Sequence, residues 1–324
     1  MLISPTMLRI EGVRQLRNPY TLAFTLVMPV AMYLLFGASM SYGSQPVGHG
    51  NVSFYVMASM AAYGTAVAMS SLTSLAATEA TQGWGRQLAM TPLSTAGYVV
   101  TKLLNAVSFA VLALILVFVA GMATGAEVDS AWRWLATAGI ILSLGLVYGL
   151  FGLGVGLFFG GEAAAALASI SMTFFAFLGN VFMPLDGVML DFAHFTPMYG
   201  FVALSRWPLT EGMLTTGQSD PLWMLILNVA VWVLLFVLQP SLIRAGRYDI
   251  HMRTGLLGLA LAVATAITAV PVALLAVERD ASGLEVEREA VAVELHVVLR
   301  IRLSEFRLGE RVLRAQHGHL RLRA

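Results

Sequence analysis

The sequence predicts an all-α membrane protein with six membrane-spanning helices, and three observations carry that prediction. Of the 324 residues, 58% are hydrophobic and only 11% are charged, whereas a soluble domain carries about a quarter charged residues. Six apolar runs continue without Asp, Glu, Lys or Arg for about twenty residues, the length that a helix needs to cross a bilayer. Short segments rich in glycine, serine, proline or charge separate these runs.

Two of the runs carry residues that predict how they pack. Pro29 lies inside the first run and should kink it, because proline lacks a backbone N–H. The fourth run is rich in glycines two to four residues apart, which let helix backbones approach closely. The predicted spans are about residues 20–39, 54–78, 102–123, 135–159, 163–183 and 222–243.

Residues 7–19, ahead of the first span, predict an amphipathic helix at the membrane surface. Leu8, Val13 and Leu16 would face the lipid, while three arginines stay among the headgroups. These residues also form a basic flank that orients the first span, and the two interpretations are compatible.

Four hydroxyl side chains in the second run are candidates for lining a pathway through the membrane. They are polar but uncharged, so they could face a passage. The alternative is that each one bonds to its own helix or to a neighbouring helix, which is the commoner use of such residues in spans. The sequence leaves both interpretations open. The four residues are Ser70, Ser71, Thr73 and Ser74.

Several kinds of chemistry are excluded by what the sequence lacks. There is no cysteine, which excludes disulfides and thiol chemistry. No glycine loop precedes Lys102, so the chain has no Walker A motif, and it has no Gly-x-Ser-x-Gly motif. We therefore expect that the chain is not an enzyme and that it holds no metal or cofactor of its own. The net charge of +1 decides nothing about nucleic acid, and we expect no nucleic-acid partner.

A polar interruption, residues 77–104, separates the second span from the third. Trp84 lies between Gly83 and Gly85, and its amphipathic ring suits the headgroup level. Pro92 should end any helix here, because the residue before a proline is pushed out of the α region. A short helix along the membrane surface would explain this mixture, and a solvated loop is the alternative. The polar side chains around the tryptophan are Glu79, Gln82, Arg86 and Gln87.

The motifs in this stretch, read in order, resemble the coupling segment of type-2 ABC exporter permeases. They are most similar to the drug-resistance branch found in high-GC bacteria, and the resemblance covers about residues 7–245. The family often carries more charge at four places where this chain has Ala80, Thr81, Ala89 and Met90. The matching residues are Glu79, Gly83-Trp84-Gly85-Arg86-Gln87-Leu88, Thr91-Pro92-Leu93 and Lys102-Leu103-Leu104.

The resemblance implies the permease subunit of an ATP-driven exporter. A separate ABC ATPase dimer would bind ATP and Mg²⁺, and a second permease chain, identical or different, would complete the pathway. The substrate would be a hydrophobic drug or lipid-like molecule, moved out across a bacterial cell membrane. The residues expected to couple the chain to the ATPase are Glu79, Gly83, Trp84, Arg86, Gln87 and Pro92.

Residues 184–221, between the fifth and sixth spans, mix prolines, charges and aromatic side chains. The resemblance implies that they form short helices on the outer face that close the pathway. The alternative is an ordinary outer loop.

The distribution of positive charge predicts that the N-terminus lies in the cytoplasm. With this orientation, Arg133 and Arg206 are the only positively charged residues among the first 247 that lie outside. The polar segment 77–104 then faces the cytoplasm as a coupling helix. The positive residues placed inside are Arg9, Arg14, Arg17, Arg86, Lys102, Arg244 and Arg247.

Residues 248–324 fit the resemblance poorly, so we divide the chain into a transmembrane domain, 1–247, and an additional C-terminal part. Residues 255–277 form a seventh apolar run that is long enough to span. The tail beyond it is charged and rich in arginine, and apolar residues alternate over 291–303 as in a strand. The alternative function is therefore a membrane sensor or signalling protein that uses this tail.

Overall fold

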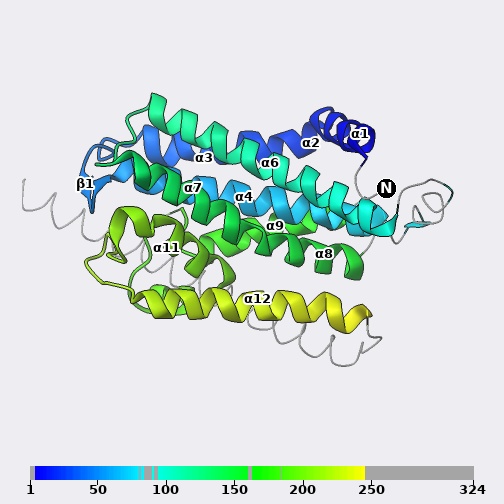
Figure 1. The fold of residues 1–324 in the computed structure, drawn as a ribbon. Coiled ribbons are helices and arrows are strands. Elements are labelled where there is room, and N and C mark those ends of the chain that lie inside the picture. The colour runs from blue at the N-terminus through cyan, green and yellow to red at the C-terminus, as the bar shows by residue number, and fades with distance from the viewer. Residues whose placement is uncertain are drawn as a thin grey trace, which may run out of the picture. The chain divides into compact units, whose positions relative to one another are not determined.

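The computed structural model describes residues 4–79, 82–83, 90, 94–159, 163–182 and 184–244, and most of them are helical (Figure 1). The predicted all-α class is confirmed, with one short antiparallel hairpin, β1 (Pro46–Val47) and β2 (Gly50–Asn51), within the described residues. The helices are α1 (Pro5–Leu16), α2 (Pro19–Leu22), the π-helical η1 (Ala23–Val27), α3 (Met28–Tyr33), the π-helical η2 (Leu34–Ala38), α4 (Val52–Glu79), α6 (Thr95–Ala123), α7 (Ala131–Gly145), α8 (Val147–Phe159), α9 (Ala163–Leu178), α10 (Gly187–Ala193), α11 (Pro197–Thr210) and α12 (Leu222–Arg244).

Four helical stretches are long and apolar enough to cross a membrane, and they coincide with the first four predicted spans. The fifth and sixth predicted spans correspond to shorter apolar helices, so the count of six stays a prediction. The seventh run, 255–277, and the predicted strand, 291–303, lie outside the described residues. The four long stretches are Pro19–Ala38, Val52–Glu79, Gly97–Ala123 and Ala131–Phe159, and the two shorter ones are Ala163–Leu178 and Leu222–Leu238.

The first span contains two π-helical segments on either side of α3, which carries Pro29, and the predicted kink stays a prediction. Pro29 is the second residue of α3, directly after the π-helical η1. The residues before the proline are themselves helical, and Met28 N donates to Ala23 O five residues earlier, so the proline lies next to a π-helical segment of a longer helical stretch. Gly64 of α4 makes room for the proline, since a Cβ at Gly64 would lie 2.8 Å from Pro29 Cγ.

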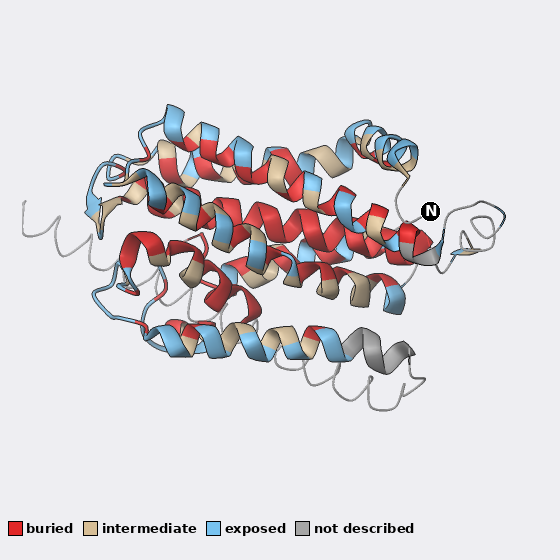
Figure 2. Ribbon diagram, in the orientation of Figure 1, coloured by how far each residue is buried: buried red, intermediate tan, exposed pale blue. Residues whose placement is uncertain are grey.

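Helix α4 lies at the centre of the described helices, and Figure 2 shows it buried along most of its length. In its most apolar stretch 89% of the residues are buried, against α6, α8 and α9 among others. Its sequence is rich in alanine, serine and threonine. Small side chains of this kind allow neighbouring helices to approach closely in a membrane, where apolar burial alone does not drive association.

Helix α8 packs directly on the backbone of α4 through two glycines. A Cβ at Gly152 would lie 2.0 Å from the Ser70 carbonyl oxygen, and a Cβ at Gly156 would lie 2.3 Å from that of Ser74. Real Cβ atoms do not approach backbone so closely. The close approach predicted from the glycine spacing is therefore present at these two positions, whereas Gly154 meets nothing within 4 Å.

The short helices predicted between the fifth and sixth spans are present as α10 and α11. Helix α11 packs against α4, α7 and α12. Its C-terminal end reaches the hairpin, where His49 N donates a hydrogen bond to Leu209 O at 2.9 Å. The placement of these helices on the outer face of the membrane stays a prediction.

Candidate functional site

The predicted coupling segment begins and ends at the same end of two antiparallel helices. Helix α4 ends at Glu79 and α6 begins at Thr95 (Figure 1). Gly83 has a φ of +91°, a backbone conformation that glycine adopts far more readily than other residues. A turn therefore explains the glycine at this position. The other predicted coupling residues within the segment, Trp84, Arg86, Gln87 and Pro92, lie outside the described residues, and their role stays a prediction.

Five side chains meet where α4 ends and α6 begins. Glu79 lies between Arg14 of α1 and Lys102 of α6, with its Oε1 2.5 Å from Arg14 Nη2 and its Oε2 2.5 Å from Lys102 Nζ. Glu11 of α1 contacts the same two cations, at 2.9 Å and 2.8 Å respectively. The Tyr98 hydroxyl donates to Glu79 Oε2 at 3.1 Å. We call these five residues the ion cluster.

The ion cluster is largely buried and its charges balance. The side chains of Glu11, Glu79 and Lys102 are 8–10% exposed, while Arg14 is 42% exposed. Two acids and two bases alternate, so each carboxylate touches both cations. Desolvating such charges costs several kcal/mol each, roughly, and only good geometry with further hydrogen bonds offsets that cost. The cluster therefore fastens α1 to α4 and α6 at the point where the coupling segment leaves them.

No sequence pattern predicts the ion cluster. From the sequence, Glu79 is predicted to dock on the ATPase, Lys102 to start a span and Arg14 to lie among the headgroups. Glu79 is 65 residues from Arg14, so no local pattern links them. The one sequence feature that singled out a member of the cluster is that Lys102 is the chain's single lysine. The structure turns the Glu79 carboxylate toward α1 and α6, and the docking role stays a prediction.

Helix α1 matches the predicted surface helix in its exposed apolar residues, but its buried side is polar. Val13 and Leu16 are 39% and 50% exposed, as expected for side chains that face lipid. The buried residues of α1 are Glu11 and Gln15. Gln15 accepts a hydrogen bond from the Thr21 hydroxyl at 3.3 Å. Polar contacts therefore attach this helix to the rest of the chain.

The four predicted pathway-lining side chains are all buried within the described helices. Ser71 and Thr73 each donate at 2.7 Å to the carbonyl four residues earlier in α4. The backbone carbonyls of Ser70 and Ser74 lie against Gly152 and Gly156 of α8, respectively. Ser70 also donates within the helix, whereas Ser74 Oγ has no hydrogen-bond partner in the part of the chain that the structure describes. Bonding within the helix is therefore favoured for three of the four side chains, and the lining of a pathway stays a prediction. The exposed fractions are 0% for Ser70, 7% for Ser71, 4% for Thr73 and 0% for Ser74.

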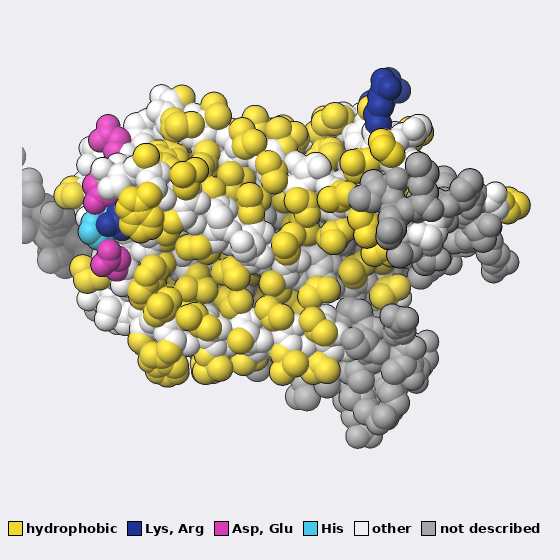
Figure 3. Space-filling model, in the orientation of Figure 1, with side chains coloured by type: hydrophobic (Ala, Val, Ile, Leu, Met, Phe, Trp, Pro, Cys, Tyr) yellow, Lys and Arg dark blue, Asp and Glu magenta, His cyan; other side chains and the backbone are white. Residues whose placement is uncertain are grey.

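A second charged cluster lies at the opposite end of α4, beside the hairpin (Figure 3). His49 lies between two carboxylates, with Nδ1 3.1 Å from Asp129 Oδ2 and Nε2 2.9 Å from Glu211 Oε1. Arg133 of α7 bonds to Asp129 Oδ1 at 2.8 Å. A hydrogen bond with Ser130, together with the charges of Arg133 and His49, holds the pKa of the Asp129 carboxyl below its ordinary value. The cluster connects the hairpin, the α6–α7 loop and the end of α11.

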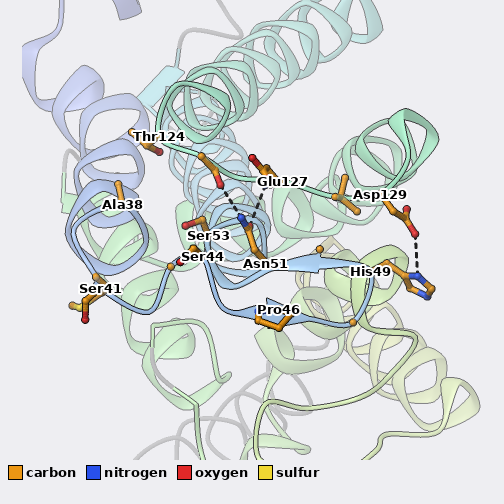
Figure 4. A pocket seen from close by; sticks show the side chains of 16 residues that line it. Ala38, Ser41, Ser44, Pro46, His49, Asn51, Ser53, Thr124, Glu127 and Asp129 are labelled. Carbon is orange, nitrogen blue, oxygen red and sulfur yellow. Dashed lines mark hydrogen bonds and ion pairs between the residues drawn. The ribbon is translucent and has the colours of Figure 1, made fainter.

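A cavity of about 850 Å³ opens beside the hairpin (Figure 4). Asn51 organises one side of it: Nδ2 donates to Gly125 O at 2.8 Å, and Oδ1 accepts from Phe54 N at 2.9 Å and from Glu127 N at 3.1 Å. These bonds join the α6–α7 loop to the start of α4. In the part of the chain that the structure describes, no group of three or more His, Asp or Glu side chains is arranged to hold a metal ion.

Arg206 of α11, which the charge distribution places outside, is 3% exposed. Its guanidinium donates to Ser59 Oγ at 2.7 Å, to the Tyr55 hydroxyl at 2.8 Å and to Asn180 O at 2.7 Å. It also lies 4.0 Å from the centre of the Tyr55 ring. Neutral oxygens and an aromatic face therefore stabilise this buried cation, and the contacts fasten α11 to α4 and to the end of α9.

Comparison with known proteins gives two matches. The family model described as "ABC-2 type transporter" matches residues 5–208, which include the ion cluster and the predicted coupling segment. The chain is also similar to "Putative transport permease YvfS" of Bacillus subtilis (strain 168). The two are 27% identical over 240 residues, which cover 72% of this chain and 94% of that protein. The similarity to the drug-resistance branch of high-GC bacteria stays a prediction.

Proposed function

Because this chain belongs to the ABC-2 type transporter family, we propose that it is the membrane subunit of an ATP-driven exporter in a bacterial cell membrane. A transport permease of this family works with an ABC ATPase in a membrane complex. ATP and Mg²⁺ would then be bound by the ATPase, and this chain would provide the pathway for a hydrophobic drug or lipid-like molecule.

The observation that carries this proposal is the ion cluster, which joins the two ends of the coupling segment. Glu79 lies near the start of the segment, residues 77–104, and Lys102 lies near its end, with Lys102 Nζ 2.5 Å from Glu79 Oε2. A segment that is anchored at both ends transmits a force to α4 and α6 instead of moving independently of them. Closure of the ATPase dimer would push on Trp84 and Arg86, and tilting of α4 and α6 would open the pathway outward, a two-state change.

The remaining parts of the proposal concern orientation, partners and substrate. The excess of arginine at the ion-cluster end supports a cytoplasmic location for that end. Two permease chains would pair around one pathway, with Ser70, Ser71, Thr73 and Ser74 as its candidate lining. The lack of charge in the apolar runs supports a hydrophobic substrate.

The test is coupling to the ATPase in the reconstituted complex. We expect that Trp84→Ala and Arg86→Ala each leave the chain folded and inserted but weaken ATPase binding about thirtyfold, because truncating an aromatic or arginine anchor commonly costs about 2 kcal/mol. The measurements are co-purification of the ATPase, ATP hydrolysis stimulated by candidate hydrophobic drugs, and drug export from cells.

The matched control is Trp132→Ala, which removes a tryptophan of 56% exposure at the start of α7, near the hairpin end. We expect this variant to bind the ATPase and to export normally. Full ATPase binding, stimulation and export in both Trp84→Ala and Arg86→Ala would show that the segment is only a loop. Failure of the unaltered chain to co-purify with any ABC ATPase would refute the exporter proposal itself.

A further inference from the structure

The chain makes a short non-helical turn, residues 194–196, between α10 and α11. Thr196 is extended, with φ −85° and ψ 151°, and Pro197 starts α11 without an N–H group. Within the turn, Thr196 N and Oγ1 both donate to Ala193 O at 2.8 Å. The helix hydrogen-bond pattern is interrupted after Ala193 and begins again at Thr196, the N-cap of α11.

Four consecutive carbonyls, those of residues 194–197, accept hydrogen bonds from side chains on two other helices. The donors are Asn228 and Trp232 of α12 and Tyr148 of α8, and we call these three residues the carbonyl clasp. The bonds run from Asn228 Nδ2 to His194 O at 2.6 Å and to Thr196 O at 3.1 Å, from Trp232 Nε1 to Phe195 O at 3.2 Å, and from the Tyr148 hydroxyl to Pro197 O at 2.8 Å.

The turn lies beside the first half of α12 and is partly buried. Asn228 and Trp232 are six and ten residues beyond the start of α12 at Leu222, which places them about 9 Å and 15 Å along that helix. Ala193 is 0% exposed and Thr196 is 7% exposed, while Phe195 is 69% exposed. A backbone carbonyl that is buried away from water needs a hydrogen-bond partner from the protein. The carbonyl clasp supplies donors to this turn.

The contacts of Asn228 show that its amide is fitted to this place. A Cβ at Gly200 of α11 would lie 2.4 Å from Asn228 Oδ1, so the glycine leaves room for this oxygen, which has no hydrogen-bond partner within the described residues. With Nδ2 toward the turn, the amide donates to two carbonyls. The opposite orientation would face Oδ1 toward two carbonyl oxygens, which only accept hydrogen bonds. Asn228 therefore has one orientation that satisfies the turn.

The carbonyl clasp connects the turn to the helices that lead to the coupling segment. Tyr148 is four residues before Gly152, at which α8 packs on the backbone of α4. Helix α4 in turn ends at Glu79, beside the coupling segment. Tyr148 itself is 2% exposed and its ring lies 5.1 Å from that of Phe201 on α11. Packed contacts thus run from the end of α4 through α8 to the turn.

We propose that Asn228, Trp232 and Tyr148 are positioning residues that make α10 and α11 follow α8 and α12 during transport. This inference rests on the proposed function, since it assumes a transport movement driven by an ATPase. The clasp at rest is a property of the chain alone, so the clasp and its role in transport are tested separately.

The first experiment tests the clasp at rest, in the full chain in membranes. Ala193→Cys introduces a thiol at a site of 0% exposure in a chain without cysteine, and its labelling by N-ethylmaleimide reports exposure of the turn. Adding Asn228→Asp keeps the size of the side chain but removes the N–H donors. We expect labelling about tenfold faster, because two buried carbonyls lose their partner.

A pH profile separates this role from a loss of packing. Protonation of the new carboxyl restores one O–H donor, so the labelling rate of the Asn228→Asp chain, divided by that of the Ala193→Cys chain at the same pH, should fall as the pH is lowered. Equal labelling in the two chains, or a ratio above one that does not change with pH, would overturn the clasp.

The second experiment tests transmission in the complex with the ATPase. Labelling of the Ala193→Cys chain should differ between the nucleotide-free complex and the complex trapped with ATP and vanadate. Tyr148→Phe removes one hydroxyl and should reduce that difference several-fold. The control is Tyr63→Phe, a tyrosine of 1% exposure whose hydroxyl bonds to Thr173 Oγ1 at 2.8 Å instead of the turn.

The outcomes distinguish the inference from the function on which it rests. A Tyr148→Phe complex with the full nucleotide response, or a loss of the response in Tyr63→Phe as well, overturns transmission through the clasp and leaves the exporter proposal intact. Absence of any co-purifying ATPase refutes the exporter proposal and with it transmission, while the first experiment still decides whether the clasp holds the turn.

Discussion

Glu79 and Arg206 are both charged and buried, but different surroundings stabilise them. Glu79 lies against two cations, and Glu11 balances the remaining charge, so the ion cluster is neutral. Arg206 has carbonyl and hydroxyl acceptors and the ring of Tyr55. Removing one member of a balanced buried cluster leaves an uncompensated charge, which is more costly than removing both members of a pair. This difference makes the ion cluster testable by stability.

We predict that Glu79→Gln lowers the free energy of unfolding by roughly 3 kcal/mol, because Lys102 and Arg14 then share one carboxylate. The double variant Glu79→Gln with Lys102→Met keeps Arg14 paired with Glu11 and should be more stable than the single variant. Thermal unfolding of the purified chain in detergent measures both. Arg9→Gln, at an exposed position on α1, is the control and should melt like the unaltered chain. A Glu79→Gln melting temperature equal to that of Arg9→Gln would show that the cluster contributes no stability.

At the scale of elements, the contact between α4 and α8 depends on which face each glycine occupies. Gly152 and Gly156 face α4, where their lack of a side chain lets the two backbones touch. Gly154, between them in sequence, points to open space. The same residue type on one helix therefore has two different consequences. Because α8 also carries Tyr148, a shift of this contact would move the turn before α11 as well.

We predict that Gly152→Ala destabilises the protein by about 3 kcal/mol, the upper end of the usual cost of overpacking, because the obstacle is a backbone carbonyl that cannot rotate away. Gly154→Ala should be neutral or should gain up to about 1 kcal/mol of helix propensity. Thermal unfolding of the two variants side by side provides the comparison. Equal melting temperatures would mean that α8 does not rest on the α4 backbone at Gly152.

At the scale of the whole molecule, the family match and the described contacts concern the first part of the chain. The match ends at residue 208 and α12 ends at Arg244. The ion cluster, the carbonyl clasp and the charged cluster around His49 all lie before Arg244. The alternative function, a membrane sensor, needs the C-terminal tail. Transport by a permease of this family therefore should not require the tail, and a truncation separates the two functions.

We predict that a chain truncated after Gly246 still inserts into the membrane, binds the ABC ATPase and supports export at a rate close to that of the full chain. The physical reason is that the contacts holding the described helices together lie within the retained residues. Fractionation of membranes, ATPase co-purification and an export assay are the measurements, with the full chain as reference. Loss of insertion or of ATPase binding in the truncated chain would contradict the domain boundary.

The sequence alone determined the fold class, the positions of the first four spans and the presence of a close helix contact through glycines of the fourth run. These follow from local composition and spacing: an uncharged run of twenty residues has few stable solutions other than a helix across a bilayer. The coupling segment was predicted from contiguous motifs, and its role stays a prediction.

The tertiary structure alone decided which polar groups meet. Glu11, Glu79 and Lys102 come from three helices, and their pairing depends on how α1 lies on α4 and α6. Asn228 reads as an ordinary residue of an apolar helix until the turn at residues 194–196 is placed against it. Hydrogen bonds and ion pairs between distant residues have no sequence period, since they are set by packing geometry. The charges and amides were visible in the sequence, and only the fold revealed their partners.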